Sequence, residues 1–80
     1  MQNLTQIQLQ STADRVKLEV ILRRYLSKFK MMKSEIDYYS MQTVITFEHN
    51  FSIYQLVLPI GTTDKQIEFY LKEQLPELLL

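Results

Sequence analysis

Residues Asp14–Lys33 read DRVKLEVILRRYLSKFKMMK, and this stretch decides the fold that the sequence predicts. An α-helix turns by about 100° per residue, so side chains three and four positions apart share a face. Seven apolar side chains fall in one arc, as in a helix that lies on a core. They are Leu18, Ile21, Leu22, Tyr25, Leu26, Phe29 and Met32. The stretch contains neither Gly nor Pro, so we expect one unkinked helix from residue 14 to residue 33.

The opposite side of this expected helix carries a second, narrower apolar seam. It consists of Val16, Val20, Ser27 and Met31. Basic side chains flank the seam on both sides. An aligned apolar seam with a charged rim is typical of a protein contact surface, whereas single exposed apolar residues are ordinary. The sequence therefore predicts these partner-binding residues: Val16, Lys17, Val20, Arg23, Arg24, Lys30 and Met31.

Charge is unevenly distributed along the chain, although the net charge is zero. Residues 14–33 hold seven of the nine basic side chains and two acidic ones, a net charge of +5. Residues 34–80 hold two lysines and seven acidic side chains, a net charge of −5. Such asymmetry can pair within the fold, between copies or with a charged partner. A basic helix from Arg15 to Lys33 also suits phosphate contact, so nucleic-acid binding is the alternative hypothesis.

The segment before the expected helix has the period of a strand. In Gln2–Gln10, the side chains of Thr5, Ile7 and Leu9 alternate with glutamines, a pattern that indicates a half-buried edge strand. A disordered leader is the alternative. The side-chain oxygens of Ser11, Thr12 and Asp14 can accept the free amide protons of a first helical turn, so we expect the helix to begin at Asp14.

Two segments after the helix predict a β-hairpin. Residues 41–48 alternate apolar and polar side chains, and residues 51–59 are apolar on both faces apart from Gln55. A two-residue loop would pair Phe47 with Ser52, and a three-residue loop would pair Phe47 with Phe51. Both registers remain open at this point.

The last part of the chain predicts a short second helix. Thr63 and Gln66 stand at the two positions of a capping box, and Pro76 disfavours helix at the preceding residue, Leu75. The end of the chain, Leu78–Leu80, is too apolar to remain in water. It packs either on the core or on a partner.

These elements predict a single α+β domain over residues 1–80. We expect a small two-layer sandwich in the order β-α-β-β-α, with two helices on one face of a three-stranded sheet. A chain of 80 residues buries a modest core, so an oligomer or a partner is a realistic source of further stability.

No constellation of residues in the sequence indicates catalysis. The chain has one histidine (His49), one glycine and no cysteine, and it lacks the spacings of metal and phosphate sites. We therefore expect no enzyme, cofactor, metal or small-molecule substrate. We expect a non-catalytic interaction module, that is, a regulator, an inhibitor or an accessory subunit. It would bind another protein or a second copy of itself as a homodimer.

Neither a secretory signal nor a membrane span is evident. The first ten residues carry no basic side chain and no long apolar run, and no stretch approaches 18 apolar residues, about the minimum for a span. We expect a cytoplasmic protein that does not enter a membrane.

Overall fold

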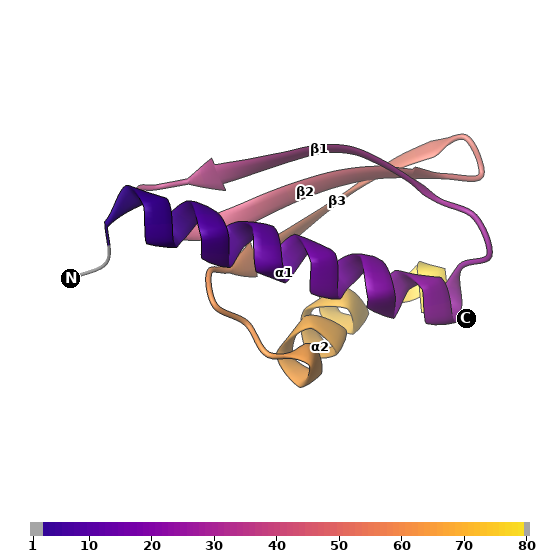
Figure 1. The fold of residues 1–80 in the computed structure, drawn as a ribbon. Helices are drawn as coiled ribbons and strands as arrows, with labels where there is room; N and C mark the ends of the chain where they lie inside the picture. Colours follow the sequence, from indigo (N-terminus) through magenta and orange to yellow (C-terminus); the bar gives the residue numbers. More distant parts are fainter. Residues whose placement is uncertain (1–2, 80) are drawn as a thin grey trace.

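The computed structural model describes residues 3–79 (Figure 1). Its elements are α1 (Leu4–Tyr25), β1 (Lys30–Asp37), β2 (Gln42–His49), β3 (Ser52–Pro59), α2 (Asp64–Gln74) and a short 3-10 helix, η1 (Pro76–Leu79). The predicted α+β class is confirmed, with two helices and a three-stranded antiparallel sheet. The predicted order is wrong, because the elements follow one another as α-β-β-β-α.

The N-terminal segment is helical, so the strand predicted over residues 2–10 is wrong from residue 4 onward. Asn3 caps α1: its Oδ1 accepts a hydrogen bond from the Gln6 backbone N–H at 2.9 Å, and Gln6 Oε1 accepts one from the Asn3 N–H at 3.3 Å. This capping box satisfies free donors of the first turn. Ile7 is buried while Leu9 is exposed, so burial does not follow the two-residue period. Residue 2 lies outside the described part of the chain.

The predicted extent of the long helix, residues 14–33, is also wrong at both ends. Asp14 lies in the middle of α1 and is fully buried, and the helix ends at Tyr25, where the Leu26 N–H donates to the Leu22 carbonyl. Residues 30–33 belong to β1. Pairing with β2 outweighs the good helix propensity of Lys and Met in this segment, because β2 presents an apolar face that needs neighbours.

The three strands are ordered β1-β2-β3. In the hairpin, Phe47 pairs with Tyr54 and His49 pairs with Ser52, so neither of the two predicted registers is correct. The turn residues are Asn50 and Phe51, with φ values of 50° and 65°. Two-residue hairpin turns that match the strand twist place both central residues in this left-handed region. The exposed Phe51 thus adopts a conformation that costs a bulky residue energy.

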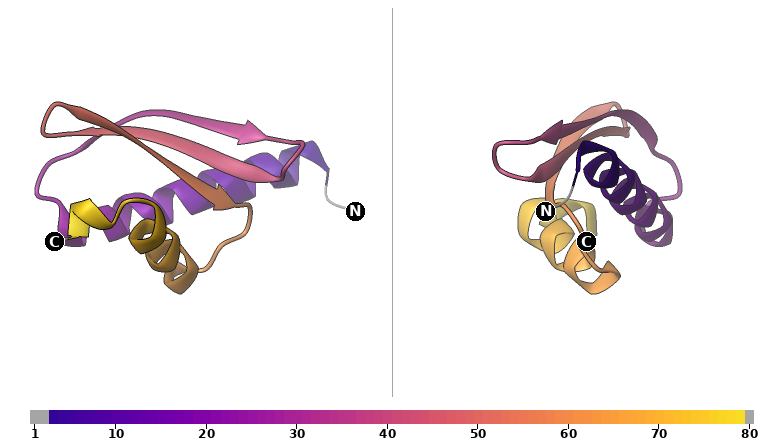
Figure 2. Two further views of the ribbon diagram at one scale, coloured as in Figure 1. Left: turned by 180° about the vertical axis from the view of Figure 1, so that it is seen from behind. Right: turned by 60° about the vertical axis from the view of Figure 1, so that its left-hand side comes forward.

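One hydrophobic core joins the two helices to one face of the sheet. Figures 1 and 2 show α1 and α2 on the same side of the strands. The buried members of this core are Leu18, Ile21, Leu22, Leu26, Ile45, Phe47, Leu56, Leu58, Ile67, Leu71, Leu75 and Leu78. The predicted capping box of Thr63 and Gln66 is confirmed at the start of α2. Of the C-terminal leucines, Leu78 is buried and Leu79 packs against the core, and residue 80 lies outside the described range.

The two edge strands of the sheet, β1 and β3, are protected in different ways from pairing with a strand of another molecule. β1 carries an irregularity between Met31 and Lys33, and its exposed positions include two lysines and a glutamate. On β3, the Gln74 side chain bonds both backbone groups of Val57: Oε1 accepts from N–H at 2.9 Å, and Nε2 donates to C=O at 2.7 Å. Because backbone groups alternate between the two sides of a strand, Gln55 presents its N–H and C=O at this same edge.

Candidate functional site: the outward face of α1

Four apolar residues line the side of α1 that points away from the core. They are Leu9, Ala13, Val16 and Val20, here called the outward stripe. Leu9 is 66% exposed, and Val16 and Val20 are each 47% exposed. At 100° per residue the four positions fall within an arc of about 60°, directly opposite the buried Leu18. α1 is therefore apolar on two opposite sides, of which the fold covers one.

The outward stripe differs in kind from the other exposed apolar side chains of residues 3–79. Tyr38, Tyr39, Met41 and Phe51 stand at turns, Met32 lies on β1, Ile53 on β3 and Phe69 on α2, and Leu4 and Tyr25 lie at the two ends of α1. Among the described residues, these side chains form no aligned series on their own elements. The stripe has successive spacings of four, three and four residues. This is the spacing of the a and d positions of a coiled coil, by which one helix packs along another.

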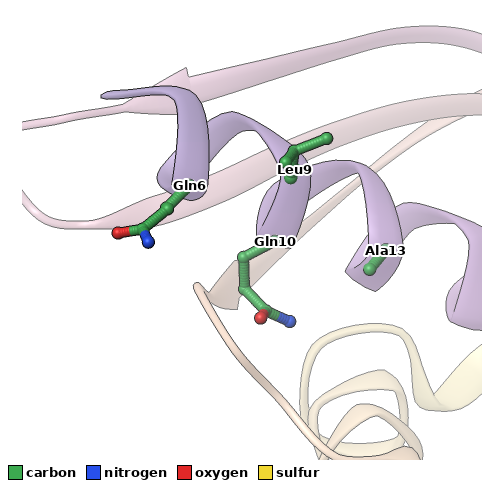
Figure 3. Close-up of a pocket in the computed structure, with 4 residues that line it drawn as sticks. All are labelled: Gln6, Leu9, Gln10 and Ala13. Atoms are coloured by element: carbon green, nitrogen blue, oxygen red, sulfur yellow. The ribbon is translucent and has the colours of Figure 1, made fainter. Parts of the chain in front are cut away.

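A shallow hollow of about 350 Å³ lies at the N-terminal end of the stripe, lined by Gln6, Leu9, Gln10 and Ala13 (Figure 3). Figure 3 shows that the Leu9 and Gln10 side chains point to different sides of the helix. Apolar and amide groups thus border one open depression. The depression has room for one or two side chains of a partner, and it carries no charged lining residue.

The basic rim of the stripe is partly engaged within the fold. Lys17 Nζ donates to the Thr62 carbonyl at 3.2 Å, and Arg24 Nη1 lies 3.2 Å from Glu68 Oε1 on α2. Arg23 Nη2 lies 3.8 Å from Glu19 Oε2, with two thirds of its side chain exposed. Exposed ion pairs contribute little to stability. Arg23 and Arg24 therefore remain available to a partner, whereas Lys17 also ties α1 to the loop before α2.

Two predicted site residues lie on another element. Lys30 and Met31 belong to β1, where Met31 pairs with Phe47 and packs against the core. Lys30 pairs with Glu48, on the opposite face of the sheet from Met31. The structure thus gathers Val16, Lys17, Val20, Arg23 and Arg24 on α1, and it places Lys30 and Met31 apart from them on β1.

The sequence-based site omits Leu9 and Ala13, because the alternating pattern of the N-terminal segment predicts a strand there and not a helix. The available signal was the pair Asn3 and Gln6, which has the spacing of a capping box. Recognition of that pair extends the helix upstream and adds both residues to the stripe.

A buried polar cluster fixes α1 against the loop between β3 and α2. Asp14 Oδ2 accepts from the Gly61 N–H at 2.7 Å, and Asp14 Oδ1 accepts from Gln10 Nε2 at 3.3 Å. Gly61 has a φ of 88°, which favours glycine. The buried Thr62 hydroxyl has no hydrogen-bond partner within residues 3–79. The cluster sets the position of the helix and hence the direction in which the stripe points.

His49 has a contact that explains its position. Its Nδ1 lies 2.7 Å from the Lys28 carbonyl oxygen, so the ring joins the hairpin to the segment between α1 and β1. Within the described range there is no group of three or more His, Cys, Asp and Glu side chains placed to hold a metal ion. The helices of residues 3–79 include none that is both long and apolar enough to cross a membrane.

Comparison with known proteins adds no relative: the chain matches no protein-family model, no curated protein and no solved structure. Its function is therefore inferred from its own surface.

Proposed function

We propose that this chain is a small protein–protein interaction module that acts by binding rather than by catalysis. Its contact surface is the outward stripe, together with Lys17, Arg23 and Arg24. In this role it serves as a regulator, an inhibitor or an accessory subunit of another protein. The observation that carries the proposal is the row of exposed Leu9, Val16 and Val20 on the side of α1 opposite the core.

The energetics of the stripe support this proposal. Each buried Å² of apolar surface contributes about 25 cal/mol, and the exposed parts of Leu9, Val16 and Val20 forgo that gain in the isolated chain. The buried side of α1 already supplies the core, so the stripe has no packing role within residues 3–79. An apolar centre with a charged rim is the usual composition of a specific contact.

A photo-crosslinking experiment tests the surface. A benzophenone amino acid replaces Val16 in one variant and Phe69, an exposed side chain of α2, in a matched control variant. We expect protein adducts from position 16 and few from position 69. Adding Val20→Asp should abolish the adducts at position 16, while the circular dichroism spectrum stays that of the parent. Equal adducts from both positions would contradict the proposal.

The nucleic-acid hypothesis has less support from the basic side chains. α1 carries four basic and two acidic residues, a net charge of +2, and the remaining three lysines of residues 14–33 lie beyond its end. Titration of labelled random DNA and RNA at two salt concentrations tests this hypothesis. Salt-dependent binding that disappears in Arg23→Ala/Arg24→Ala would establish it in place of the protein contact.

A further inference from the structure

We infer that the partner at the outward stripe is a second copy of this chain, whose α1 packs antiparallel to the first. The inference rests on the proposed function and names its partner. Three observations lead to it: the geometry of the hollow, the match of side chains across the pair, and the distribution of charge along α1.

The hollow has the geometry of a coiled-coil packing site. Its lining residues, Gln6, Leu9, Gln10 and Ala13, stand at positions i, i+3, i+4 and i+7 of one helix. In a coiled coil, each a or d side chain of one helix inserts between four such residues of the facing helix. The open depression in Figure 3 is therefore shaped to receive one apolar side chain from another helix.

The stripe is complementary to itself when a copy runs in the opposite direction. With the two-fold axis between residues 14 and 15, Leu9 faces Val20 of the other copy and Ala13 faces Val16. The same alignment places Val20 of the other copy over the hollow that Gln6, Leu9, Gln10 and Ala13 line. Each small or medium side chain then meets a larger one, and the four stripe positions of each copy are used.

Charge along α1 favours the antiparallel direction. Residues 4–13 carry no charged side chain, whereas Arg23 and Arg24 stand in the last turn. Antiparallel packing places Arg23 opposite Gln6 and Arg24 opposite Thr5, so no like charges meet. Parallel packing would place the two arginine pairs against each other, and like charges in such pairs are destabilising. Opposed helix dipoles add to the preference.

Disulfide trapping tests the direction, because the chain contains no cysteine. Leu9→Cys and Val20→Cys are oxidised mildly, each alone and as an equimolar mixture. In the antiparallel pair, the two position-9 thiols are about 16 Å apart along the axis, since each residue rises about 1.5 Å, so neither variant alone can form a disulfide there. We expect covalent dimers in the mixture and almost none in either single variant.

The outcomes separate this inference from the proposed function. Dimers from Leu9→Cys alone would indicate parallel packing and overturn the inference. Position-16 photo-adducts with other proteins, without self-adducts or trapped dimers, would overturn the second-copy partner and leave the interaction surface standing. Absence of both adducts and trapped dimers would overturn both proposals.

A charge variant provides an independent readout by sedimentation equilibrium. Gln6→Glu keeps the capping box, because Glu also occupies that position in such boxes. In the antiparallel pair the new carboxylate faces Arg23 of the other copy, so we expect the dissociation constant of the dimer to fall severalfold at low salt. Gln6→Lys should raise it severalfold. An unchanged constant in both variants contradicts the antiparallel alignment.

Discussion

The inward and outward sides of α1 are both apolar, but they differ in burial. The inward side holds Leu18 and Leu22 at 0% exposure and adds the buried polar groups of Ser11 and Asp14. The outward side holds Val16 and Val20 half exposed, and no other part of residues 3–79 covers them. Both sides have helical apolar spacing. Periodicity therefore identifies surfaces that bury apolar groups, and the fold decides which of them is covered within the chain.

The largest expected effect on stability concerns Leu22, at the centre of the inward side of α1. Leu22→Ala should lower the free energy of unfolding by about 2–5 kcal/mol, because it removes buried methyl groups and leaves a cavity in the hydrophobic core to which Leu22 belongs. Urea denaturation followed by circular dichroism measures the change. A loss below about 1 kcal/mol would show that the site collapses readily or is not part of the core.

The second effect concerns the buried carboxylate of the inward side. Asp14→Ala leaves the Gly61 N–H without its acceptor, and we expect a loss of about 1–3 kcal/mol in the free energy of unfolding. Asp14→Asn retains one side-chain oxygen and should lose less. Chemical denaturation of both variants at the same pH provides the comparison. Equal losses would show that the charge, and not the hydrogen bond, determines the contribution.

The third effect concerns the hydroxyl pair between α1 and β2. Ser11 Oγ and Thr43 Oγ1 lie 2.7 Å apart and are both buried. Ser11→Ala should cost about 1 kcal/mol, because it leaves the Thr43 hydroxyl unpaired in the core. The double variant Ser11→Ala/Thr43→Val should recover part of that loss. A double-mutant cycle by thermal or urea denaturation measures the coupling.

The smallest effect on the isolated chain is expected on the outward side. Val20→Ser should change the free energy of unfolding by less than about 0.5 kcal/mol in dilute solution. The substitution at this half-exposed position neither creates a buried cavity nor leaves a buried polar group without a hydrogen-bond partner. The same variant should weaken self-association in sedimentation equilibrium. If Val20→Ser unfolds a dilute sample as readily as Leu22→Ala, the two sides of α1 do not differ as described.

The parts of the fold that were predictable had a local cause. The capping box at Thr63 and the stop before Pro76 determine α2 within a few residues. The apolar face of the two hairpin strands predicts a sheet with one face buried under helices. The buried residues Leu18, Ile21, Leu22 and Leu26 were all in the predicted core stripe, whereas Tyr25 and Met32 proved to be well exposed.

The parts that were not predictable depend on pairing between distant segments. β1 has mostly exposed positions, so it lacks the alternation that would have identified a strand. The hairpin register depends on Phe51 adopting a left-handed conformation, which its residue type disfavours. At the candidate site, helical spacing predicts Val16, Val20, Lys17, Arg23 and Arg24, all of which lie on α1. Met31 belongs to the predicted seam only if the helix continues to residue 33, whereas α1 ends at Tyr25.

The side-chain amide of Gln74 has a consequence for how the protein behaves in concentrated solution. By bonding to Val57, it occupies a place where an incoming chain would hydrogen-bond to the free edge of β3. An ordinary strand pairs over about five or six residues, and before Val57 only Ile53 and Gln55 of β3 direct their backbone groups to this border. The uncharged side-chain amide of Gln74 thereby hinders the edge-to-edge association of β3 with other chains into fibres. Gln74 thus acts as a safeguard against aggregation, and Gln74→Ala is the change that would remove it.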